Sequence, residues 1–319
     1  MKILIIRLSS LGDIILTQPV CTLLQKAFPD AELSYMCKEQ YTMLPQLFDP
    51  PLKVIPYHKS LAFHIGLRNL HYDLVIDLHT KFSSMLVSYL LNAKRRVRYD
   101  KQRHIRSRIV AGNHSLAINS TVDLYVSALG KLGIPTSWQA PQMRLPDLPE
   151  KLLPQRDVKK IAVIPGATHA TKRYPAAQYL EFINMNPQWE FLLFGSKDDH
   201  ELCAGIARAA QANCTDYSGK LNLIELYQAM AQCDLIISGD TGPMHLAATL
   251  AKPQIAIFGA THPRLGFKPI NPQAKILCAG LPCQPCHLHG GDKCPLGHFT
   301  CMKQITAESL SSVVYEMLG

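Results

Sequence analysis

Short, wholly apolar segments that alternate with helical segments are the feature that most constrains the fold of this chain. In the second half, the pattern predicts strands over 159–166, 190–196, 234–240 and 253–261, and helices over 174–186, 198–211, 223–233 and 242–250. Strands without polar alternation are buried on both faces, which requires a parallel sheet covered by helices on both sides. The second half is therefore expected to be a doubly wound α/β domain.

The first half repeats this alternation less plainly. Strands are predicted over 2–7, 31–37 and 72–79, with helices over 82–91 and 122–133. A further helix is expected from Gly12, kinked or restarted at Pro19. The proline-rich, charged segment 146–157 is typical of a linker. We therefore expect two Rossmann-like domains, over 1–152 and 153–319, facing a cleft.

Ligands of doubly wound sheets bind at the carboxyl ends of the strands. The loops expected to carry a site are therefore 8–13, 166–173, 195–199 and 239–245. The composition, with 47% hydrophobic and 18% charged residues, excludes a mainly disordered, collagenous or coiled-coil protein. No uncharged apolar run reaches the ~18 residues of a membrane-spanning helix. The N-terminal run is interrupted by Arg7 and Asp13 and reads as a buried strand, which favours a cytoplasmic protein, free or peripheral on a membrane.

The positive charge is concentrated in the first half of the chain. Residues 1–155 hold 19 basic and 11 acidic side chains, a net charge of +8. Eight lysines and arginines lie in the stretch 94–108, which includes Arg95, Arg96, Arg98 and Arg103. Such a stretch suits clustered phosphates or carboxylates on a lipid or sugar, although a merely solvated face is the plain alternative. Tyr99 is its one aromatic residue, so a stacking platform for nucleic acid is poorly supported.

The first motif is RLSSLGD, residues 7–13, between the first strand and its helix. Asp13 lies at this strand-to-helix turn, where a carboxylate can act as a general base. The alternative is that Ser9, Ser10 and Asp13 only cap the helix.

Two further motifs in the second half suit a phosphorylated ligand. In PGATHATKRYP (165–175), Lys172 and Thr168 could meet a phosphate, unless the lysine is simply solvated. In SGDTGPMHLAATL (238–250), Asp240 ends a strand and Thr241 and Gly242 turn the chain into a helix that carries His245. Such a turn suits a diphosphate, with Asp240 accepting hydrogen bonds from sugar hydroxyls. No GxGxxG follows any strand, which argues against a dinucleotide-dependent oxidoreductase.

Five of the ten cysteines gather in the segment 278–301. Cys283, Cys286, Cys294 and Cys301 have the spacing C-x2-C-x7-C-x6-C, with three histidines between them. Such residues can form a structural zinc site, but the spacing fits no standard finger, and free thiols or a redox pair remain open. The other five cysteines are scattered and are expected to be small buried apolar residues.

Together these motifs resemble glycosyltransferase family 9, the heptosyltransferases that build the inner core of lipopolysaccharide. The resemblance covers nearly the whole chain and rests on MKILIIRLSSLGDIILTQPV, PGATHATKRYP and SGDTGPMHLAATLAKPQIAIFGAT. The segment PCQPCHLHGGDKCPLGHFTCM is similar to the cysteine-rich segment of heptosyltransferase II-like members. The family implies a GT-B fold, with the nucleotide-sugar donor in the C-terminal domain and the acceptor in the N-terminal one.

The resemblance also implies roles for individual residues. Asp13 matches the catalytic base of the family, and Thr168 and Lys172 match its donor-phosphate loop. Asp240, Thr241, Gly242 and His245 match its DTGxxH motif around the diphosphate and heptose. Asp199 falls at a ribose-binding acidic position and Leu221 at an adenine contact made largely by the backbone. Ala167 departs from members that have a second threonine there, which puts one donor contact in doubt.

The expected function is transfer of heptose from ADP-heptose to a Kdo or heptose of a lipid A-linked acceptor, in a bacterium. No cofactor is expected for catalysis, since no DxD motif is present to hold a divalent cation. Another GT-B enzyme with a different donor, or a sugar-nucleotide epimerase, is the first alternative. A basic, zinc-containing nucleic-acid-binding protein is the second, although no nucleic-acid partner is expected.

Overall fold

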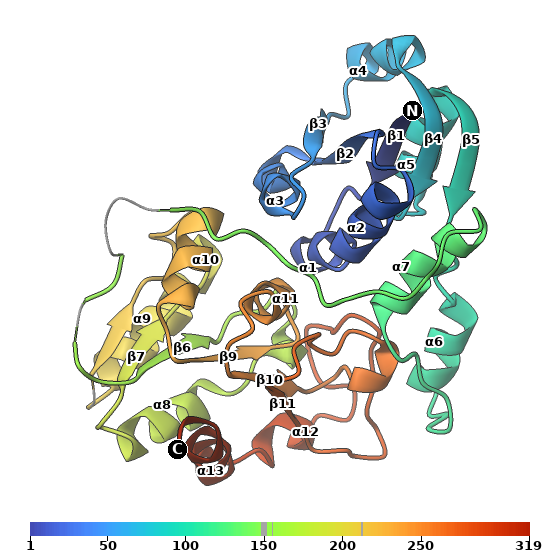
Figure 1. The fold of residues 1–319 in the computed structure, drawn as a ribbon. Coiled ribbons are helices and arrows are strands. Elements are labelled where there is room, and N and C mark those ends of the chain that lie inside the picture. The colour runs from blue at the N-terminus through green and yellow to red at the C-terminus, as the bar shows by residue number, and fades with distance from the viewer. Residues whose placement is uncertain (148–151, 155, 212) are drawn as a thin grey trace. The chain divides into compact units, whose positions relative to one another are not determined.

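The computed structural model describes residues 1–147, 152–154, 156–211 and 213–319 (Figure 1). The chain divides into two compact units. The first unit comprises residues 1–102 and 120–144, and the second comprises residues 103–119 and 145–319.

The first unit is built on a parallel sheet with the strand order β3-β2-β1-β4-β5. Its strands are β1 (Lys2–Ile6), β2 (Glu32–Lys38), β3 (Lys53–Tyr57), β4 (His71–Asp77) and β5 (Asn92–Arg98). Its helices are α1 (Leu11–Ile15), α2 (Gln18–Ala27), α3 (Met43–Leu47), α4 (Leu61–Gly66), α5 (Phe82–Leu90) and α7 (Thr121–Gly130). The central strand β1 is buried from Ile3 onward, as its apolar sequence predicts.

The second unit is built on a six-stranded parallel sheet with the order β11-β10-β9-β6-β7-β8. Its strands are β6 (Lys160–Ile164), β7 (Glu190–Leu193), β8 (Cys214–Asp216), β9 (Leu235–Gly239), β10 (Gln254–Phe258) and β11 (Ala274–Cys278). Its helices are α6 (Arg103–Val110), α8 (Ala176–Met185), α9 (His200–Ala209), α10 (Leu223–Ala231), α11 (Gly242–Ala248), α12 (Thr300–Lys303) and α13 (Ala307–Leu318). Short 3-10 turns supplement the helices of both units; two of them, η3 (Ala170–Lys172) and η4 (Lys197–Asp199), carry predicted site residues.

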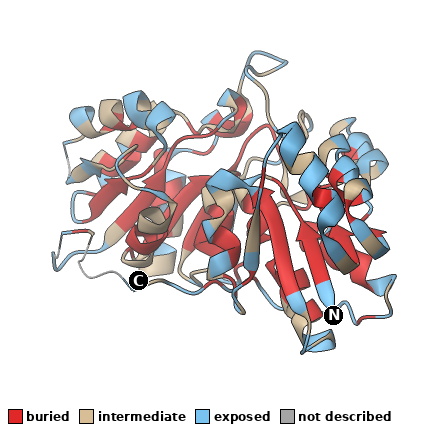
Figure 2. Cartoon of the chain, turned by 90° about the horizontal axis from the view of Figure 1, so that it is seen from above, coloured by how far each residue is buried: buried red, intermediate tan, exposed pale blue. Residues whose placement is uncertain are grey.

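The expected doubly wound architecture is confirmed in both units. The inner strands are buried, whereas the strands at the sheet edges are largely half-buried or exposed, and the outer sides of the helices are exposed (Figure 2). The expected restart of the first helix is also confirmed, because α1 ends at Ile15 and α2 begins at Gln18 with Pro19 in its first turn.

The division into units differs from the expected domains, 1–152 and 153–319, in two respects. First, α6 and the chain up to residue 119 pack on the second unit. The Nε of Arg106 donates to the Leu265 carbonyl at 3.3 Å, its guanidinium lies 4.7 Å from the centroid of the Phe267 ring, and the Ile118 amide donates to the Arg264 carbonyl. Second, the change of unit follows Arg144. Residues 148–151 and 155 of the expected linker lie outside the described residues.

None of the helices in the described part of the chain has both the length and the apolarity needed to cross a bilayer.

Candidate active site

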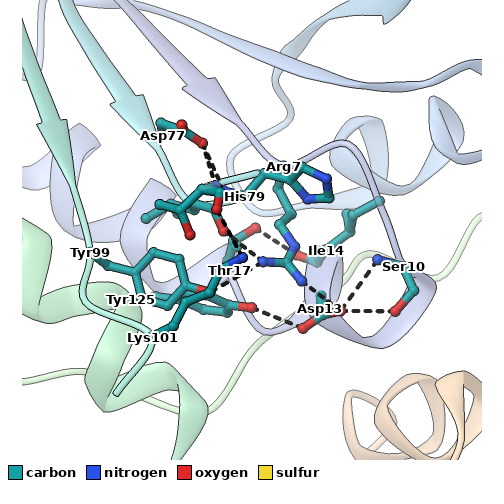
Figure 3. Close-up of polar contacts among 12 residues, drawn as sticks. Arg7, Ser10, Asp13, Ile14, Thr17, Asp77, His79, Tyr99, Lys101 and Tyr125 are labelled. Atoms are coloured by element: carbon teal, nitrogen blue, oxygen red, sulfur yellow. Dashed lines mark hydrogen bonds and ion pairs between the residues drawn. The ribbon is translucent and has the colours of Figure 1, made fainter. Parts of the chain in front are cut away.

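Asp13 lies in the first turn of α1, directly after the loop that follows β1 (Figure 3). Its Oδ2 accepts hydrogen bonds from the Ser10 amide at 3.3 Å and from the Ser10 hydroxyl at 2.9 Å. Asp13 therefore does cap its own helix, as the alternative interpretation expected. Capping does not account for its remaining contacts, one of which comes from a residue 112 positions away.

Two side chains from other elements converge on the Asp13 carboxylate. The Arg7 guanidinium lies 2.6 Å from Oδ2, and the Tyr125 hydroxyl donates to Oδ1 at 2.9 Å. Arg7 also donates to the Leu78 carbonyl at 2.6 Å and lies 5.5 Å from the centroid of the Tyr125 ring. The side chain of Asp13 keeps 19% of its surface exposed, whereas that of Arg7 keeps 9%. Asp13 is thus held by several partners and keeps part of its side chain exposed to solvent.

This arrangement fixes the charge of Asp13. Burial by itself would raise the pKa of the carboxyl, but the Arg7 cation and the hydrogen bonds from Ser10 and Tyr125 outweigh it. The net result is a pKa well below the usual range of an aspartate, so Asp13 is ionised at neutral pH.

A second buried acidic group, Asp77, lies at the carboxyl end of β4. Its Oδ1 accepts hydrogen bonds at 2.9 Å from the amides of His79 and Thr80, and its Oδ2 accepts one from the Ser84 hydroxyl at 3.0 Å. Burial, together with the charges of Arg7 and two lysines, lowers the pKa of His79 to about 3, so its imidazole is neutral. Neither Asp77 nor His79 was predicted as a site residue, although the end of an apolar strand was the signal that pointed to Asp240.

The four arginines predicted to bind the acceptor lie on two elements. Arg95, Arg96 and Arg98 lie on β5, while Arg103 lies on α6 in the other unit. The Arg96 guanidinium donates to the carbonyls of Ser88, Leu91 and Ala93, which commits it to the turn between α5 and β5.

The remaining two arginines of β5 contact a carbonyl and a carboxylate, respectively. Arg95 donates to the Lys131 carbonyl at 2.7 Å, and the Arg98 Nε lies 3.8 Å from Asp77 Oδ2.

In the second unit, the two predicted phosphate-site motifs meet. The Nζ of Lys172, in the turn η3, lies 2.9 Å from Oδ2 of Asp240, which follows β9. The same oxygen accepts a hydrogen bond from the Thr261 hydroxyl at 2.7 Å. A Cβ on Gly239 would lie 2.9 Å from the Lys172 carbonyl oxygen, so this close approach requires a glycine. The sequence predicted Lys172 and Asp240 but not Thr261.

The other predicted donor residues lie on loops of the same unit. Thr241 precedes α11 and Gly242 begins it, while His245 is buried within it. Thr168 is exposed in the loop between β6 and η3. Leu221 is half-buried in the turn before α10.

Asp199 lies near the ends of two strands of the second sheet. Its Oδ2 accepts hydrogen bonds from the Ser196 amide at 2.9 Å and the Ser196 hydroxyl at 2.7 Å. A Cβ on Gly166 or Gly195 would collide with the Asp199 side chain, so this carboxylate lies directly against the carboxyl ends of β6 and β7.

The cysteine-rich segment packs against residues 169–172, which we call the Lys172 loop. Thr171 is buried, and its hydroxyl both donates to the Gly291 carbonyl at 3.0 Å and accepts from the Gly291 amide at 2.8 Å. Gly290 has a φ of +97°, and a Cβ there would lie 2.8 Å from the His169 Cβ and 3.0 Å from Lys172 carbons. The segment thus packs against the aliphatic part of the Lys172 side chain.

All ten cysteines are free thiols. Cys21, Cys37, Cys203 and Cys233 are buried as expected, whereas Cys214 is half-buried.

The four clustered thiols interact electrostatically. Burial raises the pKa of Cys301, and the thiols of Cys283, Cys286 and Cys294 raise it further, to about 11. Backbone amides of residues 296–299 donate to the Cys294 sulfur and bring the pKa of this thiol below its usual value, against the effect of burial. Nevertheless, among the described residues no three cysteine, histidine or acidic side chains are arranged to hold a metal ion. A structural zinc bound by these thiols therefore stays a prediction.

Comparison with known proteins decides the family. The family model for glycosyltransferase family 9 (heptosyltransferase) matches residues 61–294. The chain belongs to glycosyltransferase family 9. It is therefore a glycosyltransferase, as the motifs predicted.

Curated relatives of this family 9 enzyme match it over most of their length. The lipooligosaccharide heptosyltransferase 2 of Campylobacter jejuni is 28% identical, over 97% of this chain and 96% of the relative. The lipopolysaccharide heptosyltransferase 2 of Escherichia coli is 27% identical, over 87% and 88% of the two chains.

Solved structures support the GT-B fold of the enzyme. The family 9 glycosyltransferase of Veillonella parvula gives a TM-score of 0.80 at 19% identity, over 99% of this chain and 97% of that one. The ADP-heptose lipopolysaccharide heptosyltransferase II of E. coli gives 0.76 at 23% identity, over 100% and 98%.

Proposed function

We propose that this enzyme transfers a heptose from ADP-heptose to the inner core of a lipid A-linked lipopolysaccharide, with inversion at the anomeric carbon. The observation that carries the proposal is the similarity to the C. jejuni lipooligosaccharide heptosyltransferase 2 over 97% of the chain. The acceptor hydroxyl would be on a Kdo or on a first heptose.

Asp13 is proposed as the general base. The acceptor oxygen forms its bond to the anomeric carbon while the bond from that carbon to the diphosphate breaks, and the proton passes from the acceptor hydroxyl to Asp13. The low pKa of Asp13 ensures that it is ionised, but also makes it a weak base. Proton transfer is therefore expected late, once bonding to the anomeric carbon has made the hydroxyl acidic.

Lys172 is proposed to stabilise the charge that develops on the departing ADP. In the structure its ammonium is paired with Asp240 at 2.9 Å. A bound diphosphate would compete for this ammonium, and Asp240 would then accept hydrogen bonds from the sugar. Thr168, Thr241, Gly242 and His245 would complete the contacts to the diphosphate and heptose, with Asp199 and Leu221 at the nucleoside.

On the acceptor side, the positive charge of β5 suits the phosphates and acidic sugars of an inner core. Arg95, Arg98 and, from the other unit, Arg103 remain the candidates. Arg96 is assigned a structural role, because its guanidinium already donates to three carbonyls. A lipid-linked acceptor would bring the enzyme to the cytoplasmic face of the inner membrane as a peripheral protein.

No metal is proposed to take part in transfer, because a lysine and backbone amides can neutralise the leaving group. A zinc bound by Cys283, Cys286, Cys294 and Cys301 would be structural and would have to reorganise these thiols.

The test is ADP release together with the mass change of the glycolipid, using ADP-heptose as donor. Kdo-lipid A and its mono-heptosylated form are the two acceptors, and Asp13→Ala is the control. A gain of one heptose on one acceptor, lost in the variant, supports the proposal and identifies the step. Transfer from another nucleotide sugar but not from ADP-heptose would contradict the donor, and full turnover by Asp13→Ala would contradict the base.

A further inference from the structure

The helix α5 turns an apolar stripe toward solvent. Phe82, Met85, Leu86 and Tyr89 expose 81%, 41%, 37% and 80% of their surfaces. Their spacing of i, i+3, i+4 and i+7 places them on one side of the helix. Such a stripe ordinarily faces the core of a protein, so its exposure calls for a physical cause.

Polar contacts on the inner side fix this orientation of α5. Ser84 is fully buried, and its hydroxyl donates to Asp77 Oδ2 at 3.0 Å and to the Lys81 carbonyl at 3.0 Å. Ser88 is also buried, and its carbonyl accepts from the Arg96 Nε at 2.7 Å. Rotating the stripe inward would break these contacts. The packing of the first unit therefore requires that the apolar stripe of α5 face solvent.

The neighbouring helix α4 extends this apolar surface. Leu61 and Ile65, one turn apart on α4, expose 75% and 57% of their surfaces. Phe63 of α4 and Val87 of α5 pack on the same core cluster, and the two helices are in contact. Both helices therefore cover the same side of the sheet and turn their outer sides the same way. We call this surface the α4–α5 face: Leu61, Ile65, Phe82, Met85, Leu86 and Tyr89.

The surroundings of the α4–α5 face are basic. The segments 58–71 and 78–99, which contain both helices, hold two and five lysines or arginines and no aspartate or glutamate. Lys59 and Arg68 flank α4, and Lys81 precedes α5; all three are exposed. An apolar surface bordered by cations is what an anionic bilayer attracts, by burial of the apolar side chains and by charge.

We propose that the α4–α5 face docks the enzyme onto an anionic lipid bilayer. The identity of the lipid-linked acceptor rests on the proposed function, but the docking itself does not. A second copy of the chain fits this face less well, because a symmetric contact would bring its cations together with no carboxylate from these segments to pair with them.

The first turn of α5 is connected to the proposed base by a short series of polar contacts. The Ser84 hydroxyl, in the first turn of α5, donates to Asp77 at the end of β4. The carbonyl of the next residue, Leu78, accepts a hydrogen bond from Arg7. Arg7 in turn pairs with Asp13. The start of α5 and the proposed base therefore lie at the same end of the first sheet, so a bilayer that reaches Phe82 would approach the end of the sheet that carries Asp13.

The experiment measures binding of the purified full-length protein to vesicles by flotation, without donor or acceptor. Vesicles of phosphatidylcholine alone are compared with vesicles that also contain phosphatidylglycerol. We expect binding to the anionic vesicles, and a loss of about tenfold in Phe82→Ser/Tyr89→Ser. Lys59→Gln/Arg68→Gln is expected to weaken binding and flatten its salt dependence. Met185→Ser, which changes an exposed apolar residue of the second unit, is the matched control.

Equal binding of the wild type and Phe82→Ser/Tyr89→Ser to anionic vesicles would overturn the proposal. So would a dimer in sedimentation velocity that the double variant dissociates, because the face would then be a contact between two copies. Unchanged melting temperatures establish that the variants are folded. Since no sugar is present, failure here leaves the proposed transfer reaction untouched, and failure of that reaction leaves docking intact.

Discussion

The Arg7 guanidinium lies 2.6 Å from Oδ2 of Asp13, and the Tyr125 hydroxyl donates to the other carboxylate oxygen (Figure 3). Both partners are largely withdrawn from water, so each depends on the other for compensation of its charge. This pair couples the stability of the first unit to the protonation of the proposed base.

Replacement of Arg7 by methionine is expected to lower the free energy of unfolding at pH 7 by about 3 kcal/mol, because it leaves the Asp13 carboxylate without its cation. Since the native pKa of Asp13 is depressed, the pair stabilises the fold above the unfolded pKa of about 4 and loses its contribution as the pH falls below that value. The variant should therefore differ most from the wild type at neutral pH.

Urea unfolding at pH 7 and at acid pH measures this difference. Arg7→Lys, which keeps the charge, should lose less. A deficit of Arg7→Met that is as large in acid as at pH 7 would mean that the pair does not act through the charge of Asp13.

Tyr125→Phe removes one donor from Asp13 and retains the ring. The pKa of Asp13 should rise, because the lost hydrogen bond favoured the ionised form. The free energy of unfolding should fall by about 1.5 kcal/mol. NMR titration of the carboxyl carbon measures the pKa directly, and Tyr41→Phe, at a half-buried position, is a suitable control. An unmoved titration would show that the hydroxyl contributes nothing to the charge state.

The strands that the sequence did not reveal share one position in the fold. The strands β3, β5, β8 and β11 are the edges of the two sheets, and none of the four was predicted. Edge strands need only one apolar side and tolerate charge and proline. Accordingly β5 reads NAKRRVR and β3 contains Pro56, so neither shows the apolar run that identified the central strands.

The same physical limit applies to the candidate site. Asp13, Lys172 and Asp240 could be predicted because each lies in the segment that directly follows a recognisable central strand. Tyr125 could not, because it reaches Asp13 across 112 residues and lies within an ordinary amphipathic helix. Contacts of this kind arise from tertiary packing, which local spacing does not encode.

Lys172→Ala is expected to remove the response of the protein to ADP. In the wild type, ADP should raise the melting temperature by binding the native state alone. The variant loses the ammonium that would meet the diphosphate, so this rise should largely disappear, and the KM for ADP-heptose should increase at least ~10-fold. Differential scanning fluorimetry provides the measurement, with the exposed Lys303→Ala as control. A full ADP-dependent rise of the melting temperature in Lys172→Ala would mean that this lysine does not contact the donor.

Chelation is expected to leave transfer unchanged. The proposed chemistry passes through Asp13 and Lys172 only, so enzyme dialysed against EDTA should keep its kcat. Elemental analysis of the purified protein tests the structural zinc separately. A loss of activity that added Mg²⁺ restores would contradict the metal-free mechanism.

Thr171 is expected to position Lys172 rather than to touch substrate. Its hydroxyl bridges the carbonyl and the amide of Gly291, and its own carbonyl accepts from the Ala260 amide at 3.3 Å. Three segments therefore meet at this one buried residue: the Lys172 loop, the end of β10 and the cysteine-rich segment. Thr171→Val keeps the shape but leaves the Gly291 amide without its acceptor, at a cost of about 2 kcal/mol.

The kinetic consequence should separate positioning from simple destabilisation. Displacement of the Lys172 loop should raise the KM for ADP-heptose, and the KM for the acceptor should stay near its wild-type value, because the acceptor is expected to bind the other unit. Thr171→Ser retains the hydroxyl and should restore both stability and donor KM. If Thr171→Val lost stability but kept its donor KM at a temperature where it is fully folded, the contact would support the fold of the second unit without directing the lysine.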